Sequence, residues 1–206
     1  MNKLSLMKRH IPGLIIIFSL LFFSFIPSLI LASDSTNKPE DVINIKDRGG
    51  EFSLIGKDGW VSLSDFRGKV VAIYFGYTKC PDVCPTNLSF LSSAIAQLSE
   101  VEKKQFQSIF ISVDPGRDTL QVMADYVKYF DDDMIGLSAA PDDLDPVVAR
   151  YGAYYEKVPY SNSALMYGID HTSETYIVGK DGKLVMILPH AAESIKILQA
   201  IRAAMK

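Results

Sequence analysis

Two thiols carry the chemistry that can be read most directly from this sequence. The chain of 206 residues has two cysteines, Cys80 and Cys84, and both lie in the segment YTKCPDVCPTNL. In an oxidising compartment such a pair can form a structural disulfide, but closing so short a loop stabilises a fold by only roughly 2 kcal/mol. We expect the pair to lie at the start of a helix, where thiolates are stabilised and can react or bind a metal ion.

The segments on either side of the cysteines predict a strand and a helix. Residues 70–77 read VVAIYFGY, an apolar run without alternation that is typical of a central parallel strand covered on both faces. After the cysteines, Pro85 fits the first turn of a helix. Apolar residues at spacings of three and four then form one stripe: Leu88, Leu91, Ile95 and Leu98. The cysteines are therefore expected at a strand-to-helix junction.

The rest of the chain alternates strands and helices in the same way. Apolar runs and turn residues predict the other strands: 51–55 with 60–63, 108–114, and 175–178 with 184–188 across the turn GKDGK. Apolar stripes predict the other helices: 120–130, 143–151 and 195–205, the last with Ile195, Leu198, Ile201 and Met205 facing inward. This order predicts an α/β, thioredoxin-like fold with an N-terminal β-hairpin extension.

The first 32 residues read as a targeting segment rather than as part of the fold. Three basic residues lie in the first ten, and residues 11–32 are 22 residues without a charge, long enough at about 1.5 Å per residue to span a membrane. We expect residues 1–32 to be a membrane anchor or a signal peptide, the alternative being cleavage between Ala32 and Ser33. Residues 33–48 are expected to be a flexible linker, and residues 49–206 the folded domain.

Orientation and charge limit the compartment and the partners. The basic end of the apolar segment stays in the cytoplasm, which predicts an exported domain on the periplasmic side of the inner membrane, anchored if uncleaved and soluble if cleaved. Residues 33–206 carry 18 basic and 24 acidic side chains, a net charge of −6. An acidic domain without a basic cluster is a poor nucleic-acid binder, so we expect no nucleic-acid partner.

Three segments of the chain resemble one known family. GWVSLSDFRGKVVAIYFGYTKCPDVCPTNLSFL, SVDPGRDT and YGIDHTSETYIV are similar to the signature segments of the Sco (SenC) copper chaperones for cytochrome c oxidase. The resemblance extends from Phe52 to the C-terminus. Tyr77 and Lys79 stand where phenylalanine and histidine are frequent, and GKDGK replaces a more usual Asp-Pro turn. None of these departures falls on an expected metal ligand.

The resemblance implies a copper site made of Cys80, Cys84 and His171. Thioredoxin-type enzymes use a Cys-x-x-Cys motif and place a cis-proline opposite it; here the motif is one residue longer, and His171 lies in DHTS, the loop expected at the proline's place. Two thiolates and an imidazole suit Cu(I), and with an added oxygen they can hold Cu(II). Zinc would normally take a fourth protein ligand.

Three other residues near these motifs have two readings each. Asp114 ends a buried strand and either steers the site or caps a turn. Asp170 either orients the His171 ring by accepting a hydrogen bond or has only a local structural role. Met166 is either a soft ligand or a packing residue, and His190 is left without a role. Lys79 favours a neighbouring thiolate, whereas Asp82 opposes it.

The resemblance implies a copper chaperone that helps to load the binuclear copper centre of cytochrome c oxidase subunit II. The alternative is a thiol-disulfide oxidoreductase that reduces the copper-binding cysteines of the oxidase, with Cys80 as the attacking thiol and Cys84 as the resolving one. A peroxiredoxin is disfavoured because Tyr77 and Ile73 occupy the positions of its threonine and proline. A chaperone needs His171, and a simple reductase does not.

Overall fold

The computed structural model of this chain describes residues 45–160 and 166–206. The predicted targeting segment, residues 1–32, and most of the predicted linker, residues 33–48, lie outside the described residues. Among the helices of the described ranges, none is long and apolar enough to cross a membrane. The first described element is the 3₁₀ helix η1 (Ile45–Asp47), which lies beside strand β9.

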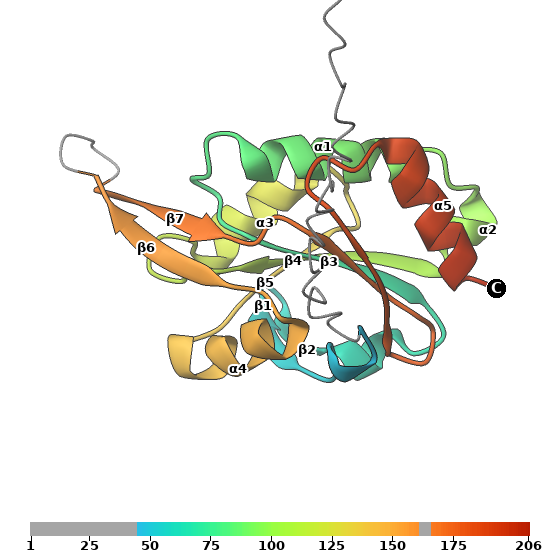
Figure 1. Cartoon of the computed structure of the whole chain (residues 1–206), viewed down its shortest axis with the longest axis horizontal. Helices are drawn as coiled ribbons and strands as arrows, with labels where there is room; N and C mark the ends of the chain where they lie inside the picture. The colour runs from blue at the N-terminus through green and yellow to red at the C-terminus, as the bar shows by residue number, and fades with distance from the viewer. Residues whose placement is uncertain (1–44, 161–165) are drawn as a thin grey trace, which may run out of the picture. The chain divides into compact units, whose positions relative to one another are not determined.

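A mixed sheet of seven strands forms the centre of the described domain, in the order β2-β1-β5-β4-β3-β8-β9 (Figure 1). The strands are β1 (Ser53–Gly56), β2 (Gly59–Ser62), β3 (Val70–Gly76), β4 (Phe106–Ser112), β5 (Ile135–Ser138), β8 (Thr175–Val178) and β9 (Leu184–Leu188). The central strands β3, β4 and β5 are parallel, whereas β8 is antiparallel to β3. Every residue of β3 is buried, as its uninterrupted apolar sequence predicts. Every residue of β4 is buried too, including the polar Gln107, Ser108 and Ser112.

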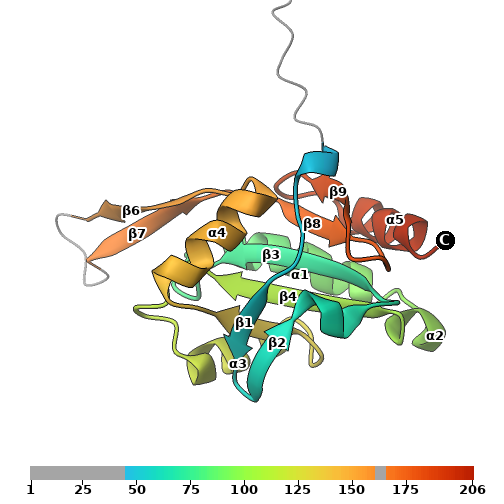
Figure 2. The same ribbon diagram turned by 90° about the horizontal axis from the view of Figure 1, so that it is seen from below.

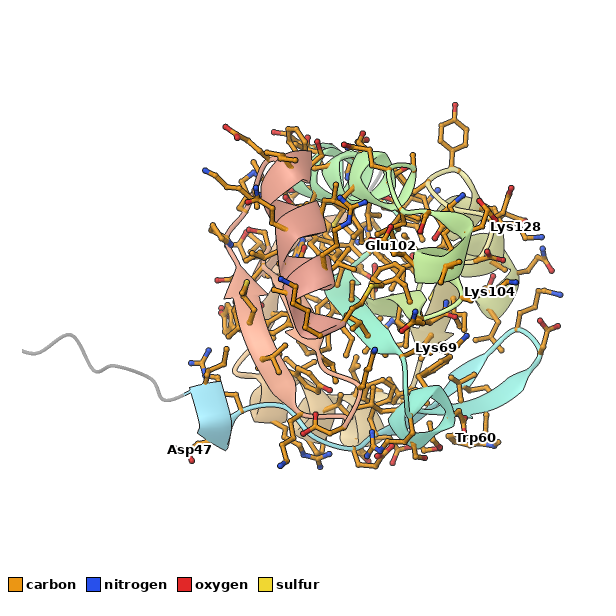
Figure 3. The ribbon with its side chains drawn as sticks, turned by 90° about the vertical axis from the view of Figure 1, so that its right-hand side faces the viewer. Asp47, Trp60, Lys69, Glu102, Lys104 and Lys128 are labelled. Atoms are coloured by element: carbon orange, nitrogen blue, oxygen red, sulfur yellow. The ribbon has the colours of Figure 1, made fainter. Side chains whose placement is uncertain are left out.

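Helices cover both faces of this sheet. They are η2 (Leu63–Phe66), α1 (Val83–Ile95), α2 (Glu100–Lys103), α3 (Leu120–Lys128), α4 (Pro141–Tyr151) and α5 (Ser194–Ala204). Helices α1, α3 and α5 lie on one face and α4 on the other (Figures 1 and 2). Figure 3 shows α2 beside α5 at the end of the domain, where the labelled Glu102 pairs with Arg202 of α5. The predicted α/β architecture with its N-terminal hairpin β1–β2 is confirmed.

One predicted apolar stripe is partly wrong. Ile195 was expected to face inward from the last helix, but 47% of its surface is exposed. The buried stripe of α5 instead contains Ile197, Leu198, Ala200 and Ile201. Because each residue turns an α-helix by about 100°, Ile195 points almost opposite to Ile197.

A second, two-stranded sheet was not predicted. Strands β6 (Tyr155–Pro159) and β7 (Tyr167–His171) pair antiparallel, with Tyr155 opposite His171. This ribbon extends away from the central sheet in both views (Figures 1 and 2). His171 was expected in a loop and is instead the last residue of β7. The correction matters because a strand end gives this side chain a fixed direction.

Candidate metal centre

The two cysteines lie in consecutive turns of backbone after β3. Cys80 follows the strand in a turn closed by its own N–H, which donates to the Tyr77 carbonyl at 3.2 Å. Cys84 is in the first turn of α1, and its N–H donates to Cys80 Sγ at 3.4 Å. Both are free thiols, with exposures of 8% for Cys80 and 0% for Cys84. The helix N-terminus thus holds both sulfurs, as expected, and excludes most water from them.

His171 reaches the same point from the end of β7. Its Nε2 lies 3.3 Å from Cys84 Sγ, and its Nδ1 lies 2.8 Å from the carbonyl oxygen of Thr172. A carbonyl only accepts hydrogen bonds, so Nδ1 carries the proton and Nε2 of the neutral ring presents its lone pair to the sulfur. This is the arrangement that metal-binding histidines adopt, with the second ring nitrogen donating to a carbonyl or carboxylate.

Of the two readings of Asp170, the one in which it orients this ring is wrong. Asp170 is exposed on β7, next to the half-buried His171. Neighbouring residues of a strand point to opposite faces, so the Asp170 carboxylate faces away from the ring. The backbone carbonyl of Thr172, and not the Asp170 carboxylate, accepts the hydrogen bond from His171 Nδ1.

The three side chains form one compact group. One ligand atom from each of Cys80, Cys84 and His171 lies within 4.8 Å of the others. A metal held at about 2.0–2.3 Å from three ligands at the corners of a triangle requires corners roughly 3.5–4 Å apart. The observed spacing is close to that, so a small rotation of these side chains suffices to close them on one ion.

The two thiols differ strongly in acidity. The pKa of Cys80 is lowered to about 4, first by a hydrogen bond from the Cys84 thiol and then by the N–H groups of Cys84 and Asp82. Burial and the negative charge on Cys80 raise the pKa of Cys84. Lys79 is exposed, and Asp82 acts on Cys80 through its backbone rather than through its carboxylate. The reduced site therefore holds one thiolate and one thiol before any metal arrives.

Aromatic rings and a glycine enclose this group. The rings of Tyr74 and Tyr77 meet the His171 ring edge-on, with centroids 6.3 and 5.7 Å away. At Gly76 an added Cβ would lie 2.9 Å from Cys84 Sγ, too close for any other residue without displacing the sulfur. Sequence reasoning missed Tyr74 and Gly76, although alternate residues of a strand share one face and the two precede the cysteines by a few residues.

Comparison with known proteins places the chain in a family. Residues 41–206 match the family model described as SCO1/SenC. The chain belongs to the SCO1/SenC family. An SCO2-like protein of Rickettsia prowazekii is 36% identical to it over 186 residues, which cover 86% of this chain and 89% of that protein.

Solved structures of SCO1/SenC proteins have the same fold. The crystal structure of Arabidopsis thaliana ScoI with copper bound matches with a TM-score of 0.70 and 34% identity, covering 76% of this chain and 97% of that one. A structure of BsSco, a member of the Sco family of cytochrome c oxidase assembly proteins in which a disulfide switch was identified, matches with a TM-score of 0.60 and 20% identity over 78% and 94% of the chains. The second likeness shows the fold alone. The predicted thioredoxin-like fold and the Sco (SenC) resemblance are confirmed.

The other candidate residues of this SCO1/SenC chain lie outside the sulfur and imidazole group. Asp114 is fully buried. Arg117 pairs with its carboxylate, and the Tyr167 hydroxyl donates a hydrogen bond to the same carboxylate at 2.8 Å. It thereby joins the loop after β4 to the ribbon that carries His171. Met166 is 69% exposed, and His190 is also exposed. His190 does not belong to the group.

The low pKa of Cys80 predicts selective alkylation in acid. A thiol reacts as its thiolate, and a pKa of about 4 keeps Cys80 ionised far below its usual range. We expect the rate constant for iodoacetamide at Cys80 to stay nearly constant from pH 8 to about pH 5 and to fall through about pH 4, with Cys84 unmodified. Timed quenching and peptide mass spectrometry measure this, and urea-unfolded protein is the control. A Cys80 rate that climbs tenfold per pH unit between pH 6 and 8 would refute the assignment.

Proposed function

We propose that this protein binds one copper ion through Cys80, Cys84 and His171 and carries it as cargo. The observation that supports this most strongly is the convergence of two sulfurs and Nε2 within 4.8 Å at a buried helix N-terminus. Soft thiolates with one imidazole in a three-coordinate set favour Cu(I) over the harder divalent ions. A copper-bound relative, Arabidopsis thaliana ScoI, supports the same choice of metal.

Each of the three ligand residues contributes to copper binding in a different way. Cys80 supplies a thiolate that exists before the ion arrives, since its pKa is about 4. Cys84 must lose its proton when copper binds, so uptake releases a proton and is favoured by higher pH. His171 presents Nε2 as its ligand atom, because the Thr172 carbonyl accepts the hydrogen bond of the other ring nitrogen, Nδ1. Burial of Cys84 slows oxidation of the loaded site by solutes.

The acceptor in this proposal is the binuclear copper centre of cytochrome c oxidase subunit II. Membership of the SCO1/SenC family supports it, as does the naming of BsSco within a family of cytochrome c oxidase assembly proteins. Handing over Cu(I) needs an acceptor with thiolate ligands of its own, which replace Cys80, Cys84 and His171 one by one. Another copper-carrying protein with such ligands is the alternative partner.

A second candidate function is thiol-disulfide exchange with the oxidase. The specific observation in its favour is the pairing of an ionised Cys80 with a protonated, buried Cys84. Cys80 would attack a disulfide of the partner, and Cys84 would then displace the partner's thiolate and leave a Cys80–Cys84 disulfide. Reduction by an external thiol would reset the pair. Both functions require the same reduced cysteines, so they can coexist.

The variant His171→Ala separates the two functions. For a copper carrier we expect the variant to cycle between dithiol and disulfide with glutathione, yet to lose most copper affinity and to fail to restore oxidase activity in cells lacking the protein. His190→Ala, which removes an exposed histidine outside the site, is the matched control and should behave like the wild type. Normal oxidase assembly with His171→Ala would favour the reductase instead.

We further propose that the domain works on the exported side of a membrane, tethered by residues 11–32. The length of that uncharged segment, 22 residues, supports a membrane anchor. If it is retained, the native protein should remain in the membrane pellet after a high-pH carbonate wash and should start at or near Met1. A soluble protein that starts at Ser33 would show that the segment is cleaved.

A further inference from the structure

A buried amide lies one turn along α1 from Cys84. Asn87 is 4% exposed, and its side chain makes contacts with two different loops. Its Nδ2 donates to the carbonyl oxygen of Ser173, and its Oδ1 accepts from the N–H of Ala191 at 2.7 Å. Buried amides are costly unless their hydrogen bonds are satisfied, so this side chain holds both loops in place.

The first of those loops begins at His171. The Thr172 carbonyl accepts the hydrogen bond from His171 Nδ1. Tyr154 holds Thr172 on one side: the Thr172 N–H donates to the Tyr154 carbonyl at 3.0 Å, and the Tyr154 N–H donates to Thr172 Oγ1 at 3.1 Å. Ser173 is fixed on the other side by Asn87. The peptide carrying the Thr172 carbonyl is therefore held from both ends.

We propose that Asn87 is a positioning residue for the copper site, and this inference rests on the proposed copper-binding function. By holding the Ser173 carbonyl it keeps the Thr172 carbonyl against Nδ1 of His171. That contact fixes the proton on Nδ1 and turns the Nε2 lone pair toward Cys84. Since Asn87 and Cys84 are on the same helix, α1 sets both a ligand sulfur and the direction of the opposing imidazole.

The two contacts of Asn87 have different consequences and need separate variants. Ala191 has a backbone φ of 53°, so the Oδ1 contact also supports a left-handed residue in the second loop, which follows β9. Asn87→Ala removes both contacts. Asn87→Asp keeps an acceptor for Ala191 and removes the donor to Ser173, since an ionised carboxylate has no N–H.

Ser92→Ala is the matched control for lost stability. Ser92 is also on α1, and its hydroxyl donates to a loop carbonyl, that of Phe130, at 2.5 Å. Its loss removes a comparable side chain-to-backbone hydrogen bond from the same helix without touching the segment after His171. Thermal unfolding of all variants shows whether they fold and how far each is destabilised.

The test uses the full-length chain, reduced and copper-free, with ¹⁵N-labelled histidine. The His171 ring signals, assigned by their loss in His171→Ala, should show the Nδ1–H tautomer alone in the wild type and in Ser92→Ala. In Asn87→Asp and Asn87→Ala we expect a mixture of tautomers. Titration with Cu(I) against a chelator should show an affinity about 10- to 100-fold lower for both Asn87 variants, as is usual for lost partners of metal ligands, and unchanged affinity for Ser92→Ala.

Unchanged tautomers in both folded Asn87 variants would overturn the proposal, and so would a loss of affinity in Ser92→Ala equal to theirs. The tautomer readout needs no metal. A tautomer shift in a protein whose wild type takes up no Cu(I) would therefore contradict copper binding while upholding the positioning role of Asn87.

Discussion

Replacing Cys84 or Cys80 with alanine is expected to abolish tight copper binding. Structural metal sites with four protein ligands are worth about 10–16 kcal/mol, so one ligand accounts for roughly 3 kcal/mol, or on the order of a hundredfold in affinity. The loss should be greater here, because a lone thiolate and an imidazole leave Cu(I) under-coordinated. Titration of the reduced protein with Cu(I) against a competing chelator measures the effect.

Met166→Ala is the matched control for removal of a sulfur atom. Met166 is 69% exposed, unlike the buried Cys80 and Cys84, so its loss should leave the copper affinity unchanged. Wild-type copper affinity in either cysteine variant would contradict the assignment of Cys80 and Cys84 as copper ligands. A loss of affinity in Met166→Ala would show that the ligand set is incomplete.

The largest effect on stability is expected for Arg117→Ala. The Arg117 guanidinium pairs with the fully buried Asp114 carboxylate, lies over the Tyr167 ring at 3.7 Å and donates to the Tyr167 carbonyl at 2.9 Å. Removing one partner of a buried ion pair costs about 3–5 kcal/mol because the other charge is left without compensation. Urea unfolding of the domain should show a fall of that size in the free energy of unfolding.

The same substitution should weaken the copper site, since Tyr167 and His171 are on one strand. Arg202→Ala, which breaks an exposed ion pair with Glu102 at the other end of the domain, is the control and should leave both stability and copper affinity nearly unchanged. Equal unfolding free energies for Arg117→Ala and Arg202→Ala would mean that the buried pair does not hold the ribbon.

The parts of the fold that the sequence predicted depend on local patterns. The spacing of apolar residues predicted which parts of two elements are buried. These are the strand from Val70 to Gly76 and the helical stripe of Leu88, Leu91 and Ile95. The cysteines and His171 were placed together because the chain resembles the Sco (SenC) family and because His171 stands where thioredoxin-type enzymes have a cis-proline opposite their cysteines. The structure confirms that these three side chains meet.

The parts that escaped prediction depend on distant contacts. The ribbon β6–β7 has the burial of an exposed hairpin, with Glu156, Lys157 and Asp170 outward, and no apolar run marks it. Its position is set by Arg117 and Tyr167, residues from separate segments. The partner of His171 Nδ1 is a backbone carbonyl, which no side-chain pattern can reveal, and the role of Asn87 depends on two loops that meet only in the folded chain.

X-ray absorption at the copper edge of the reduced, copper-loaded wild-type protein tests the central claim most directly. One Cu(I) per chain, surrounded by two sulfur atoms and one imidazole nitrogen, is the result that Cys80, Cys84 and His171 predict. A copper ion with one sulfur or none, or with nitrogen and oxygen neighbours alone, would contradict the site.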